Sequence, residues 1–101
     1  MHIIEILLPL FDNKGTRFVA EAYGRVREEL VERFGGLTAF TRSPAEGVWV
    51  EGGQRSRDDI VIFEVMADEL DRSWWETYRK TLEERFQQDA IIVRAREIEL
   101  L

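Results

Sequence analysis

The residues best suited to chemistry in this sequence are four charged side chains in otherwise apolar segments. Glu5 lies in the apolar run near the N-terminus, Glu64 lies in the apolar run 60–67, and Arg94 and Arg96 lie near the C-terminus. Two neighbouring carboxylates can raise one another's pKa and act as acid and base, and an arginine fork binds carboxylates or phosphates bidentately. The same groups can instead pair with each other across strands. The set therefore indicates either a pocket for a small anionic or polar ligand or a structural group of salt bridges.

The remaining composition excludes most other catalytic and metal-binding chemistry. His2 is the only histidine and there is no cysteine, so a Ser-His-Asp arrangement, a thiol nucleophile and a thiolate zinc site are all excluded. Gly35-Gly36 and Gly52-Gly53 do not follow the spacing of a phosphate-binding loop. We therefore expect no metal and no cofactor, and the sequence names no catalytic residue.

Length and charge limit the partners. The chain has 101 residues, of which 14 are basic and 20 acidic, and its formal charge is −6. Nucleic acids and anionic membrane surfaces are repelled by such a chain on average. The apolar run from Ile3 to Phe11 contains Glu5 and Pro9 and is too short to span a bilayer. We expect a single domain over residues 1–101, in the cytoplasm, with no nucleic-acid partner and no membrane partner.

Hydrophobic periodicity predicts the elements that position the charged residues. Strands are expected at 2–10, 37–42, 60–67 and 90–98. The first helix is expected at 17–34, with Thr16 as its N-cap. The second helix is expected to end near residue 87, with Asp68 or Asp71 as its N-cap. The segment 43–59 has no clear period and contains two turn sequences. We expect it to form a protruding hairpin centred on Gly52-Gly53.

The order of these elements predicts the fold. Strand, helix, strand, strand, helix, strand is the order of a ferredoxin-like βαββαβ plait, an α+β fold. Right-handed crossovers place both helices on one face of a four-stranded antiparallel sheet with strand order 4-1-3-2. The hairpin is then an insertion between the second and third strands. The first and third strands are the most apolar, as their central position requires.

Alternation along the strands leaves one sheet face uncovered by helices. The positions predicted beneath the helices are Ile4, Ile6, Leu8, Val61, Phe63, Val65, Ile91, Val93 and Ala95. The open face is expected to carry Ile3, Glu5, Leu7, Ile62, Glu64, Met66, Arg94, Arg96 and Ile98, with Phe40 and Arg42 from the edge strand. Such a face is too apolar for a solvated surface. We expect a homodimer through the open sheet face; the alternative cover is the hairpin of the same chain.

Trp49 is the aromatic residue that no helix or strand period explains, because it lies in the irregular segment. We expect it to cover the open face of its own chain or to insert into a neighbouring one. The candidate ligand or interface residues are thus Glu5, Phe40, Arg42, Trp49, Glu64, Arg94 and Arg96. An RNA-recognition domain shares this element order but reads bases with several aromatics on the open face, whereas Phe40 is the single one expected here.

Two short sequences carry a family resemblance. Phe34-Gly35-Gly36-Leu37-Thr38, followed by Gly47-Val48-Trp49, resembles an uncharacterised family of small bacterial proteins. At the level of fold the chain is similar to the dimeric α+β barrel group, which includes small monooxygenases and stress or antibiotic-biosynthesis proteins. The resemblance implies no catalytic role for any residue of this chain.

Two functions follow as hypotheses. The first is a small non-enzymatic homodimeric domain of unknown biological role, which binds a small ligand or a protein partner near the open face. The second is a small cofactor-independent enzyme of the dimeric barrel, monooxygenase-like type, with Glu5, Glu64, Arg94 and Arg96 lining its pocket. The fold does not discriminate between them. A pocket holding the charged cluster favours the enzyme, and a flat, filled interface favours the binding domain.

Overall fold

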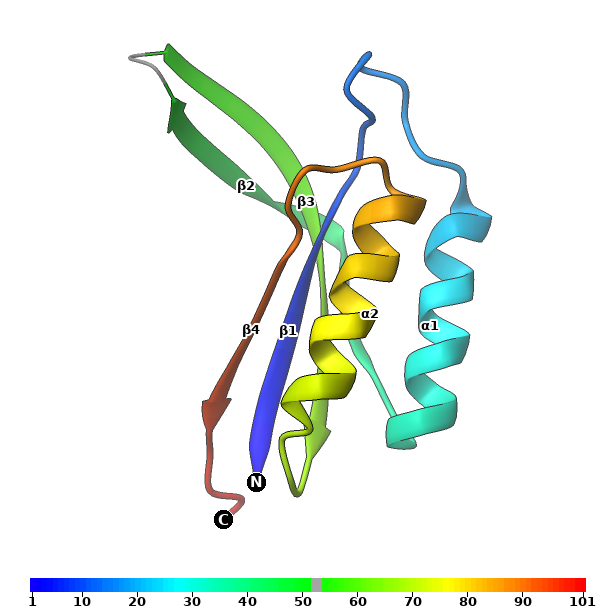
Figure 1. Cartoon of the computed structure of the whole chain (residues 1–101), viewed down its shortest axis with the longest axis vertical. Helices are drawn as coiled ribbons and strands as arrows, with labels where there is room; N and C mark the ends of the chain where they lie inside the picture. Colours follow the sequence, from blue (N-terminus) through cyan, green and yellow to red (C-terminus); the bar gives the residue numbers. More distant parts are fainter. Residues whose placement is uncertain (52–53) are drawn as a thin grey trace.

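The chain forms one four-stranded sheet with two helices. The computed structural model describes the backbone of residues 1–51 and 54–101 and the side-chain surroundings of residues 1–40 and 60–101. The elements are β1 (His2–Pro9), α1 (Ala20–Phe34), β2 (Thr38–Glu51), β3 (Gln54–Ala67), α2 (Arg72–Arg85) and β4 (Ile92–Glu97). The strands are antiparallel in the order β2-β3-β1-β4, and the helices lie side by side along the sheet (Figure 1). The predicted ferredoxin-like α+β fold is confirmed.

The hydrophobic core lies between the sheet and the helices. Alternate residues of the two central strands are buried, so the two-residue period read from the sequence is confirmed there. The helices contribute one side each, at three- and four-residue spacing. The buried residues are Ile4, Ile6, Leu8, Leu10, Val61, Phe63, Val65 and Ile91 from the sheet and its ends, Tyr23, Val26 and Leu30 from α1, and Trp75, Tyr78, Leu82 and Phe86 from α2 and its end.

The start of α1 differs from the prediction. The helix begins at Ala20 rather than near residue 17, and Thr16 does not cap it. Instead the Asp12 carboxylate accepts hydrogen bonds from the backbone N–H groups of Lys14 and Thr16, both at 2.9 Å. This turn engages Thr16 before the helix begins, so Val19 becomes the N-cap, and its side chain is 66% exposed.

The start of α2 confirms one of the two predicted caps. The Asp71 carboxylate accepts a hydrogen bond of 3.1 Å from the backbone N–H of Trp74. This is the usual way in which an acidic N-cap satisfies one of the first helical N–H groups. No helix in the described part of the chain is long and apolar enough to cross a membrane.

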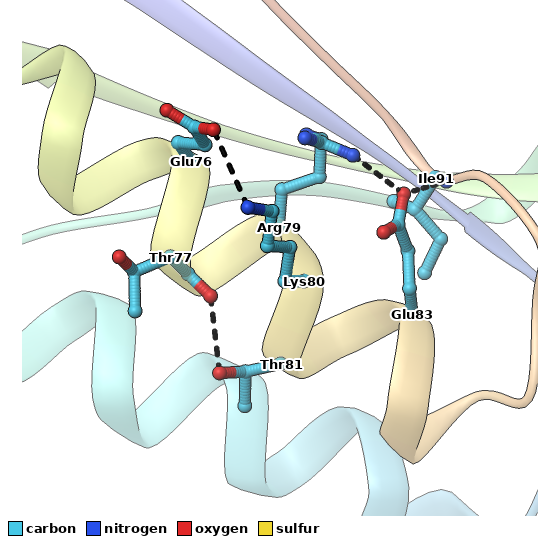
Figure 2. A network of polar contacts seen from close by, with 7 residues as sticks. All are labelled: Glu76, Thr77, Arg79, Lys80, Thr81, Glu83 and Ile91. Carbon is cyan, nitrogen blue, oxygen red and sulfur yellow. Dashed lines mark hydrogen bonds and ion pairs between the residues drawn. The ribbon is translucent and has the colours of Figure 1, made fainter.

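A polar network on α2 positions the start of β4 (Figure 2). The Glu83 carboxylate accepts hydrogen bonds from the Arg79 guanidinium, at 2.8 Å, and from the backbone N–H of Ile91, at 3.0 Å. The bond from Ile91 is the main cause that lowers the pKa of Glu83. Because Ile91 directly precedes β4, Glu83 orients the strand that carries Arg94 and Arg96.

The predicted hairpin exists as a continuation of β2 and β3. The two strands pair from Ala45 and Ile60 out to Glu51 and Gln54, whereas β1 pairs only with residues 60–67 of β3. A two-stranded ribbon therefore extends beyond the four-stranded sheet (Figure 1). The predicted strand ends at residues 42 and 60 were wrong, because the register shift between Phe40 and Ala45 breaks the alternation. The expected centre, Gly52-Gly53, lies outside the described residues.

Candidate functional site

A polar row crosses the sheet from edge to edge. In the register of the strands, Thr38 lies opposite Glu64, Glu64 opposite Glu5, and Glu5 opposite Arg94. Directly opposite residues share a sheet face. Since the neighbouring residue Ile4 is fully buried beneath the helices, this row lies on the open face. The structure thus brings the charged residues singled out in the sequence onto one surface.

Two arginines neutralise one of the carboxylates in this row. The Nε atom of Arg94 donates to Oε1 of Glu5 at 3.2 Å, and Nη1 of Arg96 lies 3.6 Å from the same oxygen. The Glu5 side chain is only 14% exposed, whereas those of Arg94 and Arg96 are 55% and 62% exposed. The arginines therefore reach across from β4 and shield a half-buried carboxylate. This geometry matches the salt-bridge interpretation of the cluster.

Apolar residues flank the polar row on the open face. On one side the register aligns Phe40, Ile62, Leu7 and Ile92, and on the other side it aligns Met66, Ile3 and Arg96. Phe40 is 47% exposed and Met66 is 50% exposed. Ile3, Leu7, Ile62 and Ile92 are half-buried. The open face is therefore largely apolar, with its charges confined to one row and to Arg96.

The second carboxylate, Glu64, lies beside a hollow of about 290 Å³. Sequence reasoning did not find this hollow. It forms where α1 ends at Gly35, whose φ of +79° is left-handed, and the chain turns into β2 at Thr38. Among the side chains that the structure describes, none is an ion-pair partner of Glu64. The hollow is lined by Phe34, Gly35, Gly36, Leu37, Thr38, Glu64, Val65 and Met66. This lining includes the Phe-Gly-Gly-Leu-Thr sequence on which the family resemblance rests.

Three further candidates are placed less completely. Phe40 lies opposite Ile62 at the β2 edge of the open face. The side chains of Arg42 and Trp49 lie outside the described residues, so their proposed roles remain predictions. Within the described ranges, no group of three or more His, Cys, Asp or Glu side chains could hold a metal ion.

The strongest ion pair lies away from the open face and joins the two helices. The Glu29 carboxylate of α1 accepts two hydrogen bonds from the Arg85 guanidinium of α2, at 2.5 and 2.7 Å, and one of 3.0 Å from the Tyr78 hydroxyl. The Arg85 hydrogen bond lowers the pKa of Glu29. Burial, together with Glu29, raises the pKa of Tyr78. Every polar group in this cluster has a partner, so we assign it to stability.

This cluster predicts a loss of stability in acid. A carboxylate whose pKa is lowered by folding stabilises the native state at pH values above its unfolded pKa, and this contribution is lost as the pH falls through its folded pKa. We expect the free energy of unfolding, measured in urea, to fall from about pH 5 downward. Glu29→Gln and Arg85→Gln should both flatten this dependence. A Glu29→Gln variant with the wild-type pH dependence would contradict the assignment.

Removal of Glu5 tests the salt bridges of the open face. We expect Glu5→Leu to lower the free energy of unfolding by about 0.5–1 kcal/mol, because Arg94 and Arg96 lose their common acceptor in a partly solvated site. The melting temperature should fall by a few degrees. Glu64→Leu is the matched control, a carboxylate on the neighbouring strand and the same face, and it should not lower the melting temperature. An unchanged melting temperature in Glu5→Leu would refute the pairing.

Comparison with known proteins identifies the fold. No protein-family model and no curated protein sequence matches the chain. A phage SAM lyase in complex with S-methyl-5′-thioadenosine superposes with a TM-score of 0.62 at 19% identity, covering 95% of this chain and 80% of the lyase. The divalent cation tolerance protein CutA1 from Thermus thermophilus gives 0.63 at 12% identity, covering 97% of this chain and 84% of CutA1. The chain shares their fold.

A third solved structure extends this likeness. The periplasmic divalent cation tolerance protein CutA from Archaeoglobus fulgidus superposes with a TM-score of 0.63 at 16% identity, covering 99% of this chain and 86% of CutA. At such identities the likeness shows the ferredoxin-like fold and nothing about activity. The resemblance to an uncharacterised bacterial family and to dimeric barrels remains a prediction.

Proposed function

We propose that residues 1–101 form one non-enzymatic domain that self-associates through the open sheet face, as a homodimer, and binds a small polar ligand or a protein partner beside that face. The observation that carries this proposal is the pair of apolar rows on a face without helices. Phe40 and Met66 are about half exposed there, and further half-buried aliphatic residues lie between them. An exposed apolar surface of this kind commonly marks an interaction site.

The charge of the open face supports a second copy as the partner. The whole chain has a formal charge of −6, so two copies repel each other on average. The described charged residues of the open face are Glu5, Glu64, Arg94 and Arg96, two of each sign. The described part of the face is therefore neutral, and a two-fold contact through it avoids the repulsion between the acidic outer surfaces.

The ribbon formed by the outer parts of β2 and β3 also supports self-association. It pairs residues 45–51 with residues 54–60, and β1 pairs with only the last of these, Ile60. A two-stranded ribbon is marginally stable in water by itself. Contact with another copy would stabilise this ribbon, and the ribbon would enlarge the interface beyond the sheet.

Light scattering tests the self-association. At micromolar concentration we expect a mass of about twice the 11.9 kDa of the chain. Replacement of residues 47–58 by Asn-Gly joins Glu46 to Asp59, which are paired, through a two-residue turn. This variant should keep the circular dichroism of a folded sheet and helices, and its dimer should dissociate more readily. A wild-type mass of 11.9 kDa would overturn the proposal.

The hollow beside Glu64 is the proposed ligand site. The Glu64 carboxylate accepts hydrogen bonds, and the Thr38 hydroxyl donates or accepts them, in a space of about 290 Å³. The Glu5 carboxylate already accepts from Arg94 and is shielded. The polar groups on offer therefore suit a small ligand with hydrogen-bond donors.

A cofactor-independent enzyme is the second candidate function. It is favoured by the two carboxylates, Glu5 and Glu64, which lie directly opposite each other on the central strands, with Glu64 lining this hollow. One structure with the same fold is a phage SAM lyase in complex with S-methyl-5′-thioadenosine, so this nucleoside is a suitable probe. Calorimetric titration should detect binding that Glu64→Gln weakens. An absence of binding to the wild type would remove the support that the lyase lends to this candidate.

A further inference from the structure

A larger hollow lies on the opposite side of the sheet, at the edge formed by β4. Its volume is about 410 Å³, and its lining includes Ile4, Val93 and Ala95 from the sheet and Leu70 and Trp75 from the segment leading into α2 and from α2 itself. His2, at the start of β1, and Glu97, at the end of β4, line it, and both chain termini lie at this end of the sheet (Figure 1). Arg94 and Arg96, two of the candidate residues from the sequence, also line it, whereas its other lining residues were not singled out.

The hollow exists because α2 leaves the last part of β4 uncovered. Ala95 lies opposite Ile4 in the register, on the face that the helices cover elsewhere. It was predicted to be buried, yet it is exposed, and Val93 is only half-buried. Ile4 is fully buried and Trp75 is 6% exposed. A small side chain at position 95 therefore leaves this part of β4, with Val93 and Ala95, open to the surface.

The lining of the hollow also includes five polar side chains, His2, Arg72, Arg94, Arg96 and Glu97. Arg72, the first residue of α2, is exposed, and no ion-pair partner for it occurs among the described side chains. The Nδ1 atom of His2 is buried without a hydrogen-bond partner in the described part of the chain, and its Nε2 atom lies 3.8 Å from Oε1 of Glu97. The Arg94 and Arg96 guanidinium groups contact Glu5 on the other face. Arg72 is thus the cation that the hollow offers to a ligand.

We propose that this hollow binds a small organic monoanion, an apolar body that carries one carboxylate. The carboxylate accepts hydrogen bonds from the Arg72 guanidinium, and the apolar body packs on Leu70, Val93 and Ala95. The carboxylate of Glu97 at the rim disfavours a multiply charged anion.

Nuclear magnetic resonance titration of the full chain with phenylacetate tests the proposal. Phenylacetate supplies an apolar ring and one carboxylate, and phenylacetamide has nearly the same shape without the charge. We expect phenylacetate to produce saturable shifts of Leu70, Ala95 and the Trp75 indole N–H, and phenylacetamide to bind more weakly. Arg72→Gln should raise the dissociation constant by about tenfold. Arg25→Gln, an exposed arginine on α1, is the matched control and should leave it unchanged.

Filling the hollow is the second arm of the test. Ala95→Leu should abolish binding while the remaining resonances stay in place. The proposal is overturned if phenylacetamide binds as tightly as phenylacetate, if Arg72→Gln weakens binding no more than Arg25→Gln, or if the shifts fall on Leu7 and Ile62 of the open face. The light-scattering mass decides the self-association separately, because the two surfaces lie on opposite sides of the sheet.

Discussion

Phe63→Ala lowers the free energy of unfolding by about 3–5 kcal/mol, the loss expected for truncating a fully buried aromatic side chain. Phe63 is 0% exposed and contacts the Tyr23 ring edge to face, with the centroids 6.5 Å apart. Its removal leaves a cavity beneath the strand that carries Ile62 and Glu64 on the other face. Urea denaturation followed by circular dichroism measures the loss.

Phe40→Ala is the matched control for this prediction. Phe40 lies on the neighbouring strand, on the open face, and is 47% exposed. We expect this substitution to cost the isolated chain less than about 1 kcal/mol. If Phe63→Ala does not fold, Phe63→Leu should still fold and cost about 1.5 kcal/mol or less. Equal losses for Phe63→Ala and Phe40→Ala would contradict the placement of the core.

Ile62→Asp has the largest effect expected on self-association. Ile62 lies in the apolar row of the open face, between Phe40 and Leu7. A carboxylate there must lose its hydration when a second copy covers the face, and no charge of opposite sign lies beside it in that row. We expect the dimer dissociation constant to rise by about a hundredfold or more. Sedimentation equilibrium measures this change.

Val31→Asp is the control for the loss of self-association. Val31 is also apolar and is 46% exposed, but it lies on α1 rather than on the open face. This variant should keep the wild-type association. If Ile62→Asp associates as tightly as Val31→Asp, the open face is not the interface, whatever the oligomeric state of the wild type.

The predicted grouping of charges on the open face rested on strand order and alternation. Glu5 and Arg94 are separated by most of the chain, yet they meet because β1 and β4 are neighbours in a ferredoxin-like sheet. The alternation of side chains along each strand also excluded the helix-covered face for both residues. Sequence reasoning left open whether the cluster forms salt bridges or a ligand pocket. The 3.2 Å bond from Arg94 to Glu5 favours salt bridges for this pair.

The two hollows escaped prediction because neither follows a period along the chain. The one beside Glu64 requires the left-handed Gly35 to turn the chain from α1 into β2 at a particular angle. The one above Ala95 depends on where α2 begins relative to β4. Such spaces result from the packing of separate elements, so the local sequence pattern carries little signal for them. The signal available was weak: an alanine at a position where the other strands carry large apolar residues.

Local periodicity was sufficient for the element order, the two faces of the sheet and most of the core, because helix and strand periods depend on neighbouring residues. It failed at the start of α1, where the Asp12 turn engages Thr16, and along the β2–β3 ribbon, where a register shift breaks the alternation. Tertiary packing determines which carboxylate pairs with the arginines of β4 and which one lines a hollow. Glu5 and Glu64 have equivalent sequence surroundings, and they differ because β4 and its arginines lie beside Glu5 and not beside Glu64.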